Sequence, residues 1–141
     1  MSALPFGNMR FRIDIDAVTS ASVCEVQFPE ARIVARAARG KRAPQVRYGP
    51  VILRRGLTRA DDWYRWWNAA REGRRQVPRV ATVTLIDERG MPGTCWTFTA
   101  ARPVAYQVSN LQALGNALLT ETLELAIGGF TANCVLDVAQ R

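Results

Sequence analysis

Short segments of alternating apolar and polar residues recur along the chain and predict a protein built mainly of β-strands. In the clearest one, residues 9–18, the side chains of Phe11, Ile13 and Ile15 fall on one face and charged side chains on the other. Further strands are predicted over residues 22–28, 31–37, 80–87, 94–100, 104–108 and 121–126, with a last strand or a tail over 130–138. Because proline lacks a backbone N–H, we expect Arg102-Pro103 to end one strand before the next begins.

One helix interrupts these strands after residue 58. Thr58 is a suitable N-cap, and Asp61 and Asp62 follow where acidic residues favour a helix start. Gly73 is expected to end the helix. The helix carries an apolar stripe at helical spacing, consisting of Trp63, Trp66, Trp67 and Ala70. We expect this stripe to be the core-facing side of the helix, with a stacking platform for a ligand as the alternative.

Turn residues separate the predicted elements. Asp87-Glu88-Arg89-Gly90 and Gly128-Gly129 are typical of turns, and residues 38–50 suit a loop or an open hairpin. Residues 111–119 also favour a loop. The sum is mainly β with one helix, an antiparallel β-sandwich or barrel with a flanking helix, in a single domain over 1–141.

Charge is concentrated in one part of this basic chain. The formal net charge is +7, and 18 of the 19 basic residues are arginine. Residues 31–60 hold nine basic residues and no acidic one. Three interpretations remain open: a solvated basic loop, an interaction arm that meets an acidic surface, and a nucleic-acid patch. The aromatic residues do not interleave with this stretch, which weakens the third.

The composition argues against catalysis. With no histidine, neither a Ser-His nor a Cys-His nucleophile pair can form. The acidic pairs have structural explanations: charge pairing for Asp14/Asp16, helix capping for Asp61/Asp62, and a turn for Asp87/Glu88. Cys24, Cys95 and Cys134 are expected to be small buried hydrophobic residues. We expect no enzyme, no cofactor and no metal, and we see no signal peptide and no membrane-spanning run.

An ordered set of motifs carries a family resemblance. The motifs are Asn8-Met9-Arg10-Phe11-Arg12-Ile13-Asp14-Ile15-Asp16, Glu25-Val26, Tyr48-Gly49, Leu53-Arg54-Arg55-Gly56, Trp63 with Trp66-Trp67, Leu85-Ile86-Asp87-Glu88-Arg89-Gly90, Trp96-Thr97-Phe98 with Pro103, and Glu121-Thr122-Leu123-Glu124-Leu125-Ala126. In this order the chain resembles the inner tail-tube proteins of contractile injection machines. These include tubes of T-even-like myophages, contractile bacteriocins and extracellular contractile injection systems, and more distantly the type VI secretion tube. The resemblance covers residues 8–130 and leaves 131–141 as a C-terminal extension.

The resemblance implies a structural protein without enzymatic activity. Its copies would form hexameric rings that stack into a tube around cargo effector or DNA, with contractile sheath and baseplate proteins as partners and no membrane anchoring. Assembly would take place in the bacterial cytoplasm, and the product would be a virion tail or a phage-tail-like particle that can be released.

Two departures from the family pattern bear on assembly. The segment before Tyr48-Gly49 is short and purely basic, and the usual histidine-glutamate-glycine ending is replaced by Ile127-Gly128-Gly129. From the basic stretch we predict a subunit or ring interface made by Arg36, Arg39, Lys41, Arg42, Arg47 and Tyr48. The alternatives to an ordinary tube subunit are a tube-initiator or adaptor ring of the same machine, and a monomeric basic nucleic-acid-binding β-domain.

Overall fold

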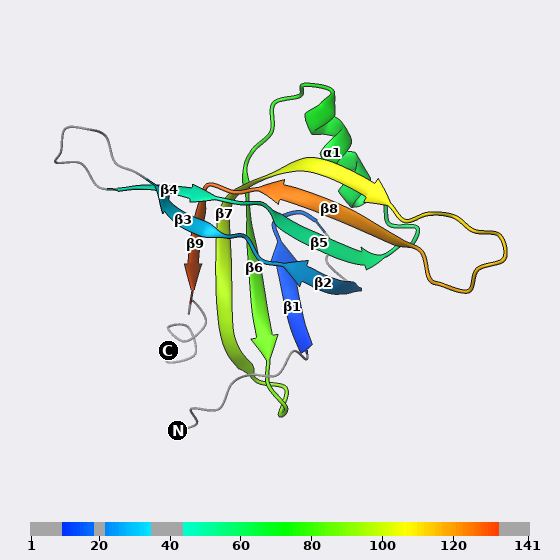
Figure 1. The fold of residues 1–141 in the computed structure, drawn as a ribbon, viewed down its shortest axis with the longest axis horizontal. Helices are drawn as coiled ribbons and strands as arrows, with labels where there is room; N and C mark the ends of the chain where they lie inside the picture. Colours follow the sequence, from blue (N-terminus) through cyan, green and yellow to red (C-terminus); the bar gives the residue numbers. More distant parts are fainter. Residues whose placement is uncertain (1–9, 19–21, 35–43, 133–141) are drawn as a thin grey trace.

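The computed structural model describes residues 10–18, 22–34 and 44–132, and within these ranges it has nine strands and one helix. The elements are β1 (Arg10–Ile15), β2 (Val23–Gln27), β3 (Ala31–Val34), β4 (Gln45–Tyr48), β5 (Val51–Gly56), α1 (Asp62–Arg71), β6 (Arg79–Ile86), β7 (Pro92–Val108), β8 (Thr120–Ala126) and β9 (Gly129–Ala132) (Figure 1). The predicted fold class, mainly β with one helix, is confirmed.

The strands form two layers that share β7. Seven strands are joined in the antiparallel order β1-β6-β7-β8-β5-β2, and β9 also pairs with β7. The first part of β7 pairs with β6 and β9, and its last part, from Arg102 to Val108, pairs with β8. In Figure 1 the β1, β6 and early β7 strands run across the direction of β5 and β8. The hairpin β3–β4 is a separate two-stranded sheet.

The predicted break at Arg102-Pro103 is wrong. β7 is one strand of 17 residues that bends as it passes from one layer to the other. Ala100 has a φ of 55°, and the pairing with β8 shifts by a residue between Pro103 and Ala105. Pro103 lies beside an irregularity in the pairing and in a part of β7 that pairs with β8 alone among the described strands, and edges and bulges are where sheets accept proline.

The core lies between the two layers and is closed by the helix. Ile13, Val83 and Phe98 come from one layer and Leu53, Leu123 and Leu125 from the other, all with 4% exposure or less. Trp63 and Trp66 of α1 are buried against them, and Trp67 is partly buried. The stripe predicted from the helical spacing therefore packs on the sheet, as expected.

The start of the helix differs from the prediction. Asp61 occupies the N-cap position and makes no capping hydrogen bond, since its Oδ1 accepts from Arg65 Nε at 2.8 Å. Thr58 lies too early to cap, and its Oγ1 accepts from the backbone N–H of Ala60 at 3.2 Å. Asp61 therefore does not cap the helix with its side chain, whereas Asp62 lies in the first turn, where an acidic side chain favours a helix start as predicted.

The predicted helix end at Gly73 and the predicted turn at Gly90 are confirmed. Gly73 has a φ of +79°, which glycine adopts without strain, and its N–H donates to the Ala70 carbonyl as the helix ends. Gly90 has a φ of +82° in the β6–β7 turn, where Asp87 Oδ1 accepts from the N–H groups of Arg89 and Met91.

The cysteines do not behave alike. A bulge between Val23 and Glu25 places Val23 and Val26 against the core and leaves Cys24 exposed as a free thiol, so the prediction that it is buried is wrong. Cys95 is fully buried but disulfide-bonded. Cys134 lies outside the described residues.

Candidate assembly surfaces and the polar cluster behind them

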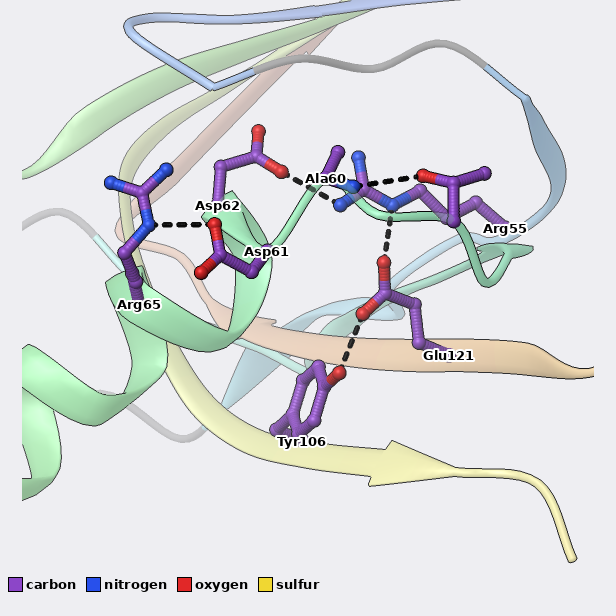
Figure 2. A network of polar contacts seen from close by, with 8 residues as sticks. Arg55, Ala60, Asp61, Asp62, Arg65, Tyr106 and Glu121 are labelled. Carbon is purple, nitrogen blue, oxygen red and sulfur yellow. Dashed lines mark hydrogen bonds and ion pairs between the residues drawn. The ribbon is translucent and has the colours of Figure 1, made fainter. Parts of the chain in front are cut away.

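A buried polar cluster joins the helix to three strands. Arg55 of β5 donates from Nε to Glu121 Oε2 at 2.6 Å and from its terminal nitrogen to Asp62 Oδ1 at 2.7 Å. Tyr106 of β7 donates its hydroxyl proton to the other Glu121 oxygen at 2.6 Å (Figure 2). The Arg55 guanidinium also lies 4.0 Å from the ring centre of Trp63.

Strand register produces this cluster. Arg55 is the direct partner of Glu121 across the β5–β8 pair, and both side chains point into the core. Their side chains are only 2% and 1% exposed. A buried charge is costly unless it is paired and hydrogen-bonded, so each of these two groups requires the other. The cluster consequently fixes the start of α1 relative to β5 and β8.

Tyr106 is held as a neutral hydrogen-bond donor. Burial and the neighbouring Glu121 carboxylate both raise the pKa of its hydroxyl above the ordinary value. Its ring is also packed against the helix, with Trp67 and Tyr64 at ring-centre distances of 6.1 and 5.7 Å. Tyr106 therefore links the polar cluster to the aromatic face of α1.

The cluster is built for positioning. Both Glu121 oxygens accept hydrogen bonds from protein donors, and Arg55 donates to two carboxylates, so each group is occupied by a neighbour. Within the part of the chain that the structure describes, no group of three His, Cys, Asp or Glu side chains could hold a metal ion. The chemistry of this region is the attachment of α1 to the sandwich.

Sequence reasoning missed these residues, although the pattern contains a signal. Arg55 is in phase with Val51 and Leu53, and Glu121 is in phase with Leu123 and Leu125, so each charge stands at a core position. Two opposite charges at core positions of different strands predict a buried pair once the strands are known to be neighbours.

Two of the predicted interface residues lie on the hairpin β3–β4. Arg47 and Tyr48 belong to β4, whereas Arg36, Arg39, Lys41 and Arg42 lie outside the described residues. Arg47 is exposed and stands directly opposite Arg32. Tyr48 is partly buried against the core, so it attaches the hairpin to its own sandwich.

The hairpin exposes apolar side chains as well as charge. Ile33 and Val46 face each other across the two strands and are 70% and 45% exposed. Arg32 pairs with Glu30 at 2.8 Å, while no ion pair is found for Arg47 among the described residues. A lone two-stranded hairpin is marginally stable in water, and two like charges opposite each other oppose pairing.

The sandwich also has unpaired strand edges. In the layer β2-β5-β8-β7, the outer strands are β2 and the last part of β7, Arg102–Val108, and each pairs on one side only among the described strands. In the other layer the outer strands are β1 and the four-residue β9. Such edges are templates for pairing with another chain.

The fold and these edges define a β-sandwich structural subunit with surfaces suited to assembly. The chain belongs to the T4-like virus tail tube protein gp19 family, whose model matches residues 7–131. It is thus a tail-tube protein, as the ordered motifs predict. No curated protein matches the chain.

Solved structures with the same fold include proteins of an anti-feeding prophage and of an extracellular contractile injection system. The chain is similar to a protein in the cryo-EM structure of the anti-feeding prophage baseplate, with 22% identity over 93% of this chain and 97% of that one and a TM-score of 0.67. A protein of the PVC sheath–tube complex in the extended state has 15% identity over 92% of each chain and a TM-score of 0.65. Hcp1 from Flavobacterium johnsoniae has 16% identity over 86% of this chain and 93% of its own, with a TM-score of 0.64.

The part of the chain that the structure describes contains no helix with the length and apolar character that crossing a bilayer requires.

Proposed function

We propose that this tail-tube protein forms hexameric rings that stack into the inner tube of a contractile phage tail or injection system. The ring joint in this proposal is the layer β2-β5-β8-β7, with the Arg102–Val108 edge of one copy beside β2 of the next. The single observation that carries it is the pair of open edges at opposite sides of one layer. Head-to-tail contacts of this kind close into a ring when the rotation per subunit divides a full turn.

The edge strands of the two layers differ in the charge that they carry. β1 carries Arg10, Arg12 and Asp14 on its outward face, a common protection of edges against pairing. The β2 and Arg102–Val108 edges carry fewer charges than β1, with Glu25 on the first and Arg102 on the second. A structure of an anti-feeding prophage baseplate that contains a similar chain was symmetrised six-fold, which supports the proposed ring size.

The hairpin β3–β4 and the basic residues beside it form the proposed contact to a neighbouring subunit or ring. Arg36, Arg39, Lys41, Arg42 and Arg47 would meet acidic side chains there. Glu88 and Glu124 suit this role because neither carboxylate forms an ion pair with another described residue of the subunit. The exposed Ile33 and Val46 would be buried in the same contact.

Sheath and baseplate proteins are the proposed partners, with DNA or an effector as cargo. We propose that the subunit assembles in the bacterial cytoplasm and acts without catalysis. The whole chain would act as one tail-tube domain, with residues 131–141 as an extension of the family core.

Negative-stain electron microscopy of the purified protein tests the ring and the stacking together. Long hollow tubes are expected. Isolated rings that never stack would instead favour a tube-initiator or adaptor ring, the alternative suggested by the short, purely basic arm. A monodisperse 15.7 kDa species at high concentration would contradict the assembly proposal.

The basic arm, which is the segment before Tyr48-Gly49, is tested by the double charge reversal Arg42→Glu with Arg47→Glu. Stacking should be weakened because two cations are replaced by anions facing an acidic surface. Arg75→Glu with Arg89→Glu makes the same change of net charge on residues outside the arm and should leave tubes intact. Normal tubes from the first variant would show that the arm does not make the contact.

A further inference from the structure

The loop between β7 and β8 exposes several leucine side chains. Leu111, Leu114 and Leu118 are 75%, 98% and 87% exposed, and residues 109–119 contain no charged side chain. The base of the loop is held, since Ser109 N–H donates to the Thr120 carbonyl at 2.9 Å. Figure 1 shows the loop projecting away from the sandwich between the end of β7 and the start of β8. An uncharged, leucine-rich projection of this kind is typical of a contact surface.

An apolar groove of about 410 Å³ lies at the β2 edge of the layer β2-β5-β8-β7, between β2 and the strands β1, β6 and β7. Its apolar lining is Phe11, Val26, Phe28, Val83, Leu85 and Trp96. Cys24 and Glu25 complete it, and the Glu25 carboxylate is paired with Arg54, so the groove presents no unpaired charge. Phe28 at its rim is 44% exposed and packs edge-on against Trp96.

The two surfaces belong to opposite edges of the layer β2-β5-β8-β7. The loop directly follows the outer segment Arg102–Val108 of β7, and β2 forms one wall of the groove. The strand registers put the loop and the start of β2 at the same end of this layer, so joining the two edges with their strands side by side would bring the loop of one copy near the β2 wall of the groove in the next. The match in charge agrees with this placement, because a neutral apolar loop meets a neutral apolar groove.

We propose that the leucine loop, residues 109–119, of one copy binds in the apolar groove beside β2 of the adjacent copy. This inference rests on the proposed ring joint and adds a specific contact to it. The contact is heterologous, so every copy in a closed ring gives one loop and receives another.

Cysteine crosslinking tests the contact, since the free thiol of Cys24 already lies in the groove. Assembled Leu114→Cys protein is treated with a short bis-maleimide and run on a denaturing gel. A ladder of covalent oligomers is expected, because each copy can link to two neighbours. The ladder should be lost when Cys24→Ala is added. Val77→Cys, which places a thiol at another exposed apolar position, should give no ladder.

The outcomes separate this inference from the proposed function. Rings or tubes of Leu114→Cys that give no Cys24-dependent ladder would overturn the loop contact and leave the tube assignment standing. A link within one chain, found by mass spectrometry, would also overturn it. A ladder that appears only after removal of residues 2–9 would show that the N-terminal segment occupies the groove, again against the proposal. Absence of rings from the wild-type protein would instead contradict the proposed function.

A second variant pair gives an independent readout. Leu114→Asp should abolish or shorten the assemblies seen by electron microscopy, because a charge would enter an apolar groove, while Val77→Asp should leave them unchanged. The far-ultraviolet circular dichroism of both variants should match wild type, since both side chains are exposed. Tubes of normal length and yield from Leu114→Asp would overturn the proposal.

Discussion

The buried cluster around Arg55 and the hairpin β3–β4 use the same kind of side chain for opposite purposes. Arg55 has 2% of its side chain exposed and is bound by two carboxylates of its own subunit. Arg47 is exposed and stands opposite another arginine. Arginine inside the sandwich completes the subunit, whereas arginine on the hairpin depends on what lies outside it. Substitutions in the cluster around Arg55 should therefore change the stability of the subunit, whereas substitutions on the hairpin should change its assembly.

The sharpest difference is expected when the buried pair is broken. Glu121→Gln should lower the free energy of unfolding by about 3–5 kcal/mol, because the buried Arg55 loses the more deeply buried of its two carboxylate partners and keeps only Asp62. Urea unfolding of the dissociated subunit measures this. The control is Glu124→Gln on the other face of β8, which should change the value by about 0.5 kcal/mol or less. Equal losses in the two variants would show that burial of the pair does not matter.

A smaller loss in the free energy of unfolding is expected from a change at Tyr106, at the edge of the polar cluster. Tyr106→Phe keeps the ring against α1 but removes the hydroxyl that donates to Glu121, and hydrogen bonds to charged groups contribute about 1.5–3 kcal/mol. The same unfolding experiment measures the loss. Tyr64→Phe is the matched control on the helix, and it should cost less because Tyr64 is exposed.

The pH dependence of stability should report on the same hydroxyl. The pKa of Tyr106 is raised in the folded protein, so the folded state holds this proton more firmly than the unfolded state does. Its contribution is complete below the ordinary tyrosine pKa of about 10 and is lost as pH rises above it. Unfolding free energies between pH 8 and about 11 should fall less steeply in Tyr106→Phe than in wild type. Parallel curves would contradict the predicted shift.

The smallest effect on subunit stability is expected on the hairpin. Ile33→Ser and Val46→Ser remove exposed apolar side chains and should change the free energy of unfolding by about 0.5 kcal/mol or less. Their effect should appear in assembly, as shorter or fewer tubes by electron microscopy. A large loss of stability in the dissociated subunit would show that the hairpin contributes to subunit stability as the core does, and the difference between the two regions would not hold.

The sequence alone determined the class of fold and much of its outline. Period-two alternation located β1, β6 and β8, helical spacing placed Trp63 and Trp66 in the core, and Gly73 and Gly90 marked real ends of elements. These features are local, because propensity, turn geometry and the position of apolar side chains act over a few residues. The order of the motifs along the chain identified the family, which no single local pattern could identify.

Only the tertiary structure decided which distant residues meet. The continuity of β7 through Pro103 depends on its change of partner from β6 to β8, and proline alone predicted a break. The capping pattern placed Asp62 at the helix start but could not show its ion pair with Arg55, because Arg55 comes from strand β5 and not from the helix. The pairing of Arg55 with Glu121, 66 residues apart, exists because β5 and β8 are neighbours in that register. A charge at a core position is visible in one strand, but its partner is fixed by the packing of another.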